Sequence, residues 1–234
     1  MDQLNNYSDE RLLIGCTYCD GKTGTRDHVP SRVLLEQPYP ENLPVVPTCP
    51  ECNAGFSLDE AYLACLIECA RTGSVESVER PKVRRIFDES PSLSARLKEA
   101  RTVSDCGLAV HSIEDERVRR IVLKLARGHA AYELSEQLRG GPSRFIAVPL
   151  NVLSTDDRDY FEEVPVPSAW PEVGTRALQR VAVLTASNTT VADDWIEVQP
   201  ERYRYFAVAN GVSVTVRIVI GEYLACEVIW AQDS

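Results

Sequence analysis

The sequence predicts an α+β protein with a metal-clamped N-terminal segment, a helical middle and a small C-terminal antiparallel sheet. Three observations support this: two Cys-x2-Cys pairs before residue 53, helical apolar spacing within 76–139, and runs rich in β-branched and aromatic residues within 143–232. The chain has 234 residues, of which 44% are hydrophobic and 26% charged, which suits a globular protein with a buried core. We expect one domain at 1–75 and a second, α+β domain at 76–234.

The two cysteine pairs indicate a structural zinc site. Cys16 and Cys19 form the first pair, Cys49 and Cys52 form the second, and 29 residues separate the pairs. Zn²⁺ takes four thiolates in a tetrahedron, and such a site has no open position for water or substrate. We therefore expect the zinc to hold the two ends of segment 20–48 together. Redox-active or incidental cysteines are the alternative interpretation.

Composition argues against several classes of protein. No run of about 18 apolar residues predicts a membrane span, and the acidic N-terminus lacks the apolar core of a secretory signal, so we expect a cytoplasmic protein with reduced thiols. The net charge is −10, and only 76–140 has a slight basic excess, which argues against non-specific nucleic-acid binding. The remaining cysteines lie in apolar runs and are expected to be buried: Cys65, Cys69, Cys106 and Cys226.

A second set of polar residues lies within the segment that zinc would clamp. Asp27 and Asn53 offer hard oxygen ligands of the kind that Mg²⁺ takes, and the clamp would bring them together. His28 would then lie beside a metal-bound phosphate as a general base, with Asn42 fixing its orientation. Taken singly, Asn42 reads equally well as a turn residue and Asn53 as a helix cap. Arg32 would contact a phosphate or remain solvated.

The stretch CTYC…DHVPSR…NLPVVPTCPECNAGFSLDE resembles the HNH endonucleases, whose ββα-metal finger carries a zinc clamp in this form. The resemblance covers roughly 14–72 and implies one-metal hydrolysis of phosphodiesters in DNA, with RNA left open. It implies that Asp27 and Asn53 bind the catalytic ion and that His28 deprotonates the attacking water. Asn53 replaces the more familiar histidine, which favours Mg²⁺ or Mn²⁺.

The whole arrangement is similar to small stand-alone HNH proteins of bacteria and phages, for which a role in defence or in mobile elements is an expectation only. The alternative function is a zinc module that binds nucleic acid or protein without cleaving it. A redox or zinc-sensing switch is a third hypothesis.

Local patterns predict the individual elements. We expect two short strands within 16–30, an extended stretch at 38–47, and a helix that begins at Ser57 with Glu60 completing a capping box. Short helices follow around 78–89 and 92–101, and a longer one runs from a cap at Ser112 to a Gly-Gly-Pro stop at 140–142. Later runs predict strands, among them 180–186 and two joined by an Ala-Asn-Gly turn at 209–211.

Two further features keep alternative interpretations. The basic residues Arg117, Arg120, Lys124 and Arg127 share one helix face, which is either a surface that follows phosphates or an ordinary solvated face. The apolar C-terminal strands would pack against the helices or form a homodimer interface. His111 and His129 lack a ligand pattern and are expected to be structural.

Overall fold

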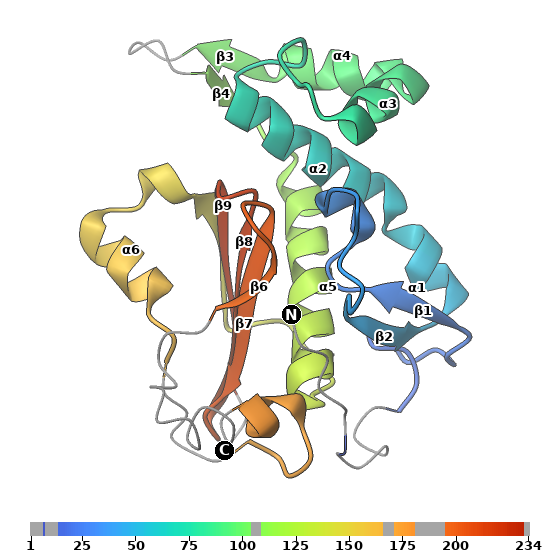
Figure 1. Ribbon diagram of the computed structural model, residues 1–234, viewed down its shortest axis with the longest axis vertical. Helices are drawn as coiled ribbons and strands as arrows, with labels where there is room; N and C mark the ends of the chain where they lie inside the picture. Colours follow the sequence, from blue (N-terminus) through green and yellow to red (C-terminus); the bar gives the residue numbers. More distant parts are fainter. Residues whose placement is uncertain (1–6, 8–13, 104–108, 166–170, 181–194, 232–234) are drawn as a thin grey trace.

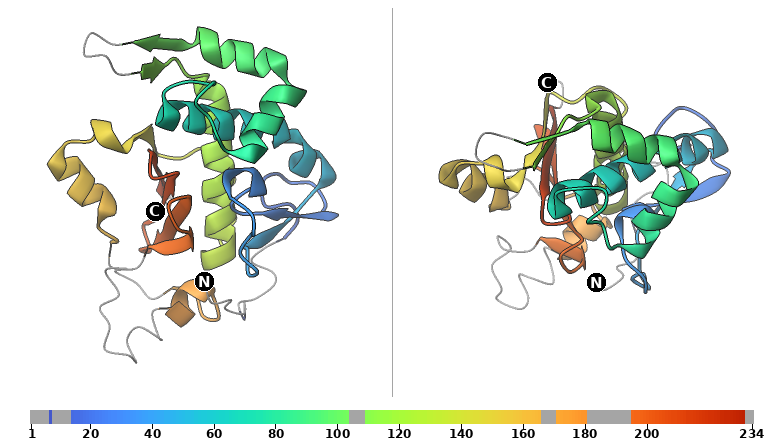
Figure 2. Two further views of the ribbon diagram at one scale, coloured as in Figure 1. Left: turned by 45° about the horizontal axis from the view of Figure 1, so that its top comes forward. Right: turned by 90° about the horizontal axis from the view of Figure 1, so that it is seen from above.

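The computed structural model describes residues 7, 14–103, 109–165, 171–180 and 195–231. These residues form the expected α+β fold, in which the N-terminal segment, the long helix α5 (Asp115–Leu134) and a 5-stranded antiparallel sheet lie as successive layers (Figures 1 and 2). Helix α6 (Thr155–Glu162) lies on the opposite face of the sheet from α5 (Figure 1).

The N-terminal segment contains two antiparallel strands followed by a helix. Strand β1 (Thr25–His28) pairs with β2 (Val45–Thr48), and the 3₁₀ turn η2 (Arg32–Leu34) lies between them in the chain. Helix α1 (Pro50–Gly55) follows directly, with Pro50 in its first turn, where a missing N–H leaves no bond unmade. Of the two strands predicted within 16–30 only β1 is present, whereas β2 forms in and just after the stretch predicted to be extended.

The middle of the described chain is helical apart from one hairpin. Its elements are α2 (Ser57–Thr72), α3 (Pro81–Glu89), α4 (Pro91–Glu99), the paired strands β3 (Arg101–Val103) and β4 (Ala109–His111), and then α5. The hairpin corrects the prediction of an entirely helical 76–139. Helix α5 ends at Leu134, where Ser135 adopts the left-handed conformation (φ 59°), so the predicted stop at Gly-Gly-Pro is also wrong.

The capping box predicted at the start of α2 does not form. Ser57 is the first residue of the helix, and its hydroxyl donates to the carbonyl of Ala54. Phe56 is the N-cap residue. The carboxylate of Glu60 instead accepts a hydrogen bond from Lys124 on α5, 2.6 Å away. A long-range charged contact therefore replaces the local pattern.

The predicted start of α5 is also two residues off. Glu114, not Ser112, is the N-cap residue, and His111 lies on β4. The backbone N–H of Glu114 donates to the hydroxyl of Tyr62 on α2 (2.8 Å), so a contact between the two helices satisfies this end of α5.

The C-terminal sheet has the strand order β5-β9-β8-β7-β6. Its strands are β5 (Arg144–Pro149), β6 (Ile196–Gln199), β7 (Tyr203–Ala209), β8 (Ser213–Ile220) and β9 (Leu224–Ala231). The predicted turn between β7 and β8 is confirmed: Gly211 has φ 82°, and the side-chain oxygen of Asn210 accepts from two backbone amides. The sequence did not predict α6 or the 3₁₀ turn η3 (Leu150–Val152). Most of the strand expected at 180–186 lies outside the described residues.

One hydrophobic cluster connects these layers. It runs from Val29 at the end of β1, through the buried face of α5, to Trp230 on β9. Five of the six apolar positions that predicted the helix are buried on α5, namely Val118, Ile121, Val122, Leu125 and Ala126, whereas Ile113 precedes the helix and is exposed. Three of the four cysteines expected in the core are buried, namely Cys65, Cys69 and Cys226, while Cys106 lies outside the described residues. Helix α5 therefore packs against the N-terminal segment on one side and the sheet on the other.

Candidate metal centre and catalytic cluster

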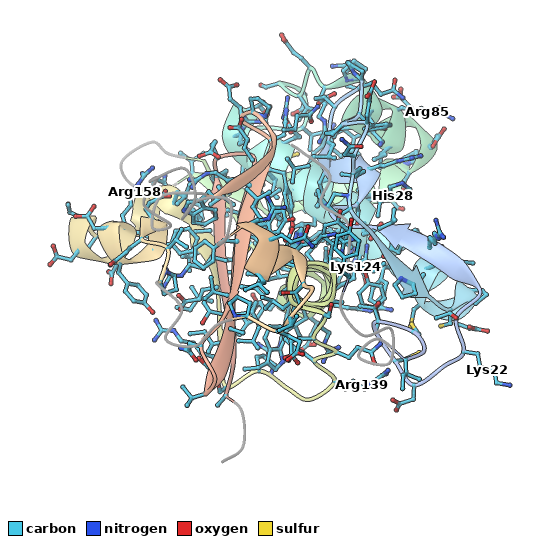
Figure 3. All side chains as sticks on the ribbon, turned by 60° about the horizontal axis from the view of Figure 1, so that its bottom comes forward. Lys22, His28, Arg85, Lys124, Arg139 and Arg158 are labelled. Atoms are coloured by element: carbon cyan, nitrogen blue, oxygen red, sulfur yellow. The ribbon has the colours of Figure 1, made fainter. Side chains whose placement is uncertain are left out.

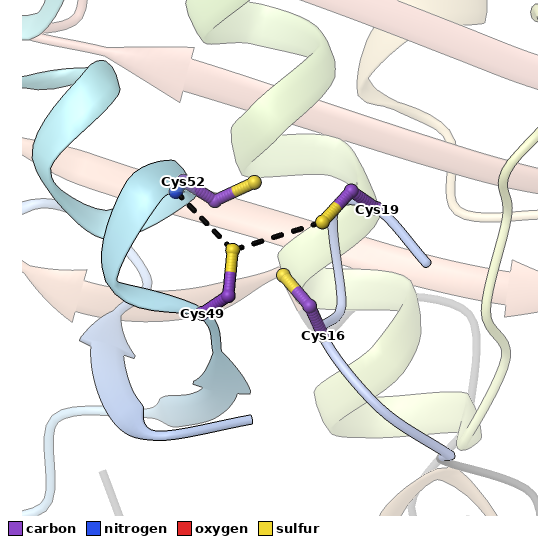
Figure 4. A group of neighbouring side chains, drawn as sticks. All are labelled: Cys16, Cys19, Cys49 and Cys52. Carbon is purple, nitrogen blue, oxygen red and sulfur yellow. Dashed lines mark hydrogen bonds between the residues drawn. The ribbon is translucent and has the colours of Figure 1, made fainter. Parts of the chain in front are cut away.

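The four N-terminal cysteines converge on one point (Figure 4). The sulfur atoms of Cys16, Cys19, Cys49 and Cys52 all lie within 4.8 Å of one another, and those of Cys19 and Cys49 are 3.7 Å apart. Four thiolates about 2.3 Å from a tetrahedral ion would lie about 3.8 Å from each other. The set therefore has the size of a closed four-sulfur site and could hold a structural metal such as zinc.

Backbone amides donate to three of the four sulfur atoms at this centre, and the pKa shifts of the thiols differ: that of Cys16 is lowered, whereas those of Cys49 and Cys52 are raised. The N–H groups of Tyr18, Gly21 and Cys52 donate to the sulfurs of Cys16, Cys19 and Cys49 at 3.3–3.4 Å. Burial alone would raise the pKa of the Cys16 thiol, but hydrogen bonds from the Thr48 hydroxyl and from nearby backbone groups outweigh it and lower the pKa to about 6. These donors suit sulfurs that bind a cation.

Gly21 gives the sulfurs room. A Cβ at this position would lie 3.2 Å from the Cys19 sulfur and 3.6 Å from the Cys49 sulfur. Any larger residue would crowd the sulfur of Cys19 and contact that of Cys49, so a turn that lacks a side chain fits the metal centre.

Asp27 lies on β1, where its side chain points toward α5 rather than into solvent. Its Oδ2 accepts a hydrogen bond from the hydroxyl of Tyr18 (2.9 Å) and pairs with the ammonium of Lys124 (2.8 Å). Lys124 is buried, and its Nζ also donates to Glu60 (2.6 Å) and to the Ser31 hydroxyl (2.8 Å). We call Asp27, Glu60 and Lys124, with Ser31 and Tyr18, the lysine cluster.

The lysine cluster is the feature that sequence reasoning missed. Lys124 was grouped with solvated or phosphate-facing bases, yet only 1% of its side chain is exposed. Within the lysine cluster both contacts of Asp27 fall on Oδ2, so Oδ1 is the oxygen left for another ligand. With both carboxylates charged, the lysine cluster retains a net charge of −1, which favours a further cation.

His28 ends β1, opposite Val45 on β2, and is half-buried. Burial lowers the pKa of His28 from its usual value, the positive charge of Arg32 lowers it further, and the charge of Asp27 opposes this shift. The imidazole is therefore neutral near pH 7, the state that a general base requires. Figure 3 shows His28 and Lys124 on the same side of α5.

Asn53 lies on α1, alongside β1. Its side-chain nitrogen donates to the carbonyl of Arg26 at 3.4 Å. Arg26 directly precedes Asp27 and His28 on the strand, so the amide lies next to the pair with which it was predicted to act. This contact uses the nitrogen of Asn53, and its side-chain oxygen is the atom suited to a metal.

Asn42 and Arg32 lie on the segment that connects the two strands. Asn42 is half-buried and precedes Val45, the strand partner of His28, by three residues. Arg32 is exposed on η2, and its guanidinium carbon lies 5.4 Å from the centre of the Tyr39 ring. The positive charge of Arg32 contributes to the lowered pKa of His28.

The basic face of α5 matches neither interpretation offered by the sequence. Arg117 and Arg120 both bind the carboxylate of Asp59 on α2, at 2.5 and 2.7 Å. Lys124 lies in the lysine cluster, and Arg127 donates to two backbone carbonyls beyond the helix. Arg117, Arg120 and Lys124 therefore hold the N-terminal segment against α5, although half of the Arg120 side chain remains exposed.

The two remaining histidines lie outside this site. His129 on α5 is fully buried; its Nε2 lies 2.8 Å from the Tyr203 hydroxyl, and its ring stacks on that of Tyr205. These contacts fit the structural role expected of it. His111 lies on the hairpin, which adjoins the far end of α2 from α1 (Figure 1).

Comparison with protein-family models, curated proteins and solved structures finds no match to this chain. Among the described helices, none combines the length and the apolar character needed to cross a bilayer.

Proposed function

We propose that this protein is a metal-dependent endonuclease of the HNH type that hydrolyses phosphodiester bonds in DNA. The observation that carries the proposal is that Asp27 and His28 end β1, between the two cysteine pairs, while Asn53 on α1 directly follows Cys52 and contacts the same strand at Arg26. A carboxylate, a neutral imidazole and an amide on these adjoining elements are the donor types that divalent-metal hydrolysis uses.

Each residue has a separate role in this proposal. Oδ1 of Asp27 and the side-chain oxygen of Asn53 would hold Mg²⁺ or Mn²⁺. When bound, the ion supplies Lewis-acid stabilisation of the charge that develops on the scissile phosphate. His28 takes the proton of the attacking water, a step that its lowered pKa permits at neutral pH. Asn42 would orient the imidazole.

The surrounding structure would hold these side chains in fixed positions relative to one another. We propose that zinc fills the four-cysteine centre and has no chemical role, because a closed four-sulfur site has no position for water. The hydroxyl of Tyr18 and the ammonium of Lys124 fix the rotamer of Asp27 through Oδ2. Fixed side chains lower the entropic cost of assembling a reactive geometry.

One observation favours a second candidate, a zinc module that binds without cleaving. The carboxylate of Asp27 is already paired with a buried ammonium, which offsets part of its attraction for a metal ion. In that case Asp27 and Lys124 are structural, and the end of β1 that carries His28 is only part of a docking surface.

Incubation with supercoiled plasmid in Mg²⁺, Mn²⁺ or chelator separates the two candidates. The proposal expects metal-dependent nicking or cutting by the wild type, lost in His28→Ala but retained in His111→Ala, a matched histidine on the distant hairpin. Circular dichroism should show that both variants remain folded. Cleavage that survives His28→Ala overturns the proposed mechanism. Binding without cleavage on plasmid, duplex and single-stranded substrates supports the second candidate.

A further inference from the structure

Two cations from different parts of the chain meet at one aromatic ring. Arg32 on η2 and Lys82 on α3 lie with their charged groups 5.4 and 5.0 Å from the centre of the Tyr39 ring. Lys82 is held there by hydrogen bonds from its ammonium to the Tyr39 hydroxyl and to the Arg32 carbonyl, both 2.7 Å. The position of the Lys82 charge is therefore set by the fold, and the Tyr39 ring brings the exposed Arg32 guanidinium beside it.

No carboxylate compensates this pair within the part of the chain that the structure describes. Every ion pair found there involves other bases, and neighbouring Arg80 is paired with Glu36 and Glu68. Two like charges on one ring repel each other, and folding them together is unfavourable unless an anion joins them. Most other bases nearby have acidic partners, as Arg85 has Glu89.

The start of α3 adds to this positive potential. Lys82 is in the first turn of that helix, which contains no acidic residue, and its N-cap residue makes no side-chain capping bond. The N-terminus of a helix carries a partial positive charge that attracts anions and disfavours a lysine. A cation at this position is unfavourable for the isolated helix but favourable for a site that binds an anion.

We propose that Arg32, Lys82 and Tyr39 form a binding site for the sugar-phosphate backbone of a nucleic acid, which positions the strand beside His28. This inference rests on the proposed function, because it places the substrate at the same site. Arg32 and Lys82 each contact a phosphate oxygen, and Tyr39 holds the two cations at a fixed spacing. They are positioning residues, since neither touches the reacting water. Lys82 lies beyond residue 75, so the 1–75 segment alone lacks part of the site.

The test measures binding of the full chain to a fluorescein-labelled DNA duplex and to the matching single strand, in chelator, between 50 and 200 mM NaCl. Loss of one phosphate contact should weaken binding about tenfold near 0.1 M salt and reduce the slope of log affinity against log salt by about 0.9. Arg32→Gln and Lys82→Gln should each show this change, whereas Lys82→Arg should restore both affinity and slope. Arg85→Gln on the same helix is the matched control and should behave as the wild type.

The outcomes separate this inference from the proposed nuclease activity. If both glutamine variants bind DNA with wild-type affinity and slope, or if the wild type binds neither strand form, the inference is wrong. If the wild type binds with the expected slopes but never cleaves plasmid, the binding site stands and the nuclease proposal fails. Where cleavage is measured, the two variants should raise KM and leave kcat nearly unchanged.

Discussion

Lys124 offers the sharpest test of the structure, because one substitution removes the only cation of the lysine cluster. Its Nζ contacts Asp27 Oδ2 at 2.8 Å, Glu60 Oε1 at 2.6 Å and Ser31 Oγ at 2.8 Å. Lys124→Met keeps the length and apolar stem of the side chain but leaves two acidic groups facing each other. The side chains of Asp27 and Glu60 are only 12% and 15% exposed, so water replaces little of the lost interaction.

The expected destabilisation is large for one residue. Removing one partner of a buried ion pair costs about 3–5 kcal/mol, and the partial exposure of the two acids favours the lower end, about 3 kcal/mol. For a chain of this size this corresponds to a fall in Tm of about 6–12 °C. Urea and thermal unfolding followed by circular dichroism would measure it. Arg85→Met is the control: it breaks an exposed pair with Glu89 and should cost less than about 0.5 kcal/mol.

A double variant tests whether the lost stability comes from the two acidic side chains left without a cation. In Lys124→Met with Glu60→Gln, one of the two uncompensated charges is gone, so a substantial part of the lost stability should return through coupling between neighbouring sites. The interpretation is wrong if Lys124→Met lowers stability no more than the exposed control does. It is also wrong if the second substitution lowers stability further instead of restoring it. Either result would mean that Lys124 does not compensate buried negative charge in the lysine cluster.

Three further predictions follow from the packing, the cysteine centre and the buried histidine. Gly128→Ala should destabilise the protein by about 1–3 kcal/mol in urea unfolding, because its Cβ would lie 2.6 Å from a methyl group of Val29, whereas Gly140→Ala, with open space around it, should be neutral. Metal analysis should find zinc bound to the wild type, and Cys49→Ser should lose both the zinc and the order of the N-terminal segment by proton NMR. Burial holds the pKa of His129 well below its usual value, so the folded protein favours the neutral ring. The free energy of unfolding should therefore be highest above about pH 6.5, the usual pKa of histidine. Below that pH it should fall by up to about 1.4 kcal/mol per pH unit. Urea unfolding at pH 7.5 and 5.5 should show that loss, and His129→Gln should reduce it. A flat pH response in the wild type would contradict the buried neutral assignment.

The sequence predicted those parts of the fold that depend on local periodicity. The spacing of Val118, Ile121 and Leu125 repeats every helical turn, and these residues are buried on α5. The alternation and turn chemistry of β7 and β8 likewise predicted a hairpin that the structure contains. The two cysteine pairs predicted a common centre because knuckle spacing itself limits where the thiols point.

Features that depend on contacts between distant residues were not predicted. Glu60 has the spacing of a capping box, but its carboxylate is used by Lys124, a residue 64 positions later in the chain. A signal was nonetheless present, since Lys124 follows Ile121 by three residues and so shares its buried face. Gly128 offered a second signal. A glycine inside a strong helix pattern often marks a place where another part of the chain lies close to the helix backbone, and here that part is Val29.

Helix α5 explains why the candidate site requires more than the four-cysteine centre. The four cysteines join the ends of segment 20–48, but β1 would still be free to rotate about that anchor. Two contacts with α5 remove this freedom: Lys124 fixes the carboxylate of Asp27, and the missing side chain of Gly128 lets Val29 pack directly on the helix. His28 lies between these two anchored residues in the chain. Because Tyr203 and Tyr205 of the sheet pack on His129 one residue further along α5, the helix ties the orientation of His28 to the C-terminal sheet as well as to the metal centre. The C-terminal part of the chain is thus part of the support for the candidate site, whatever further role it has.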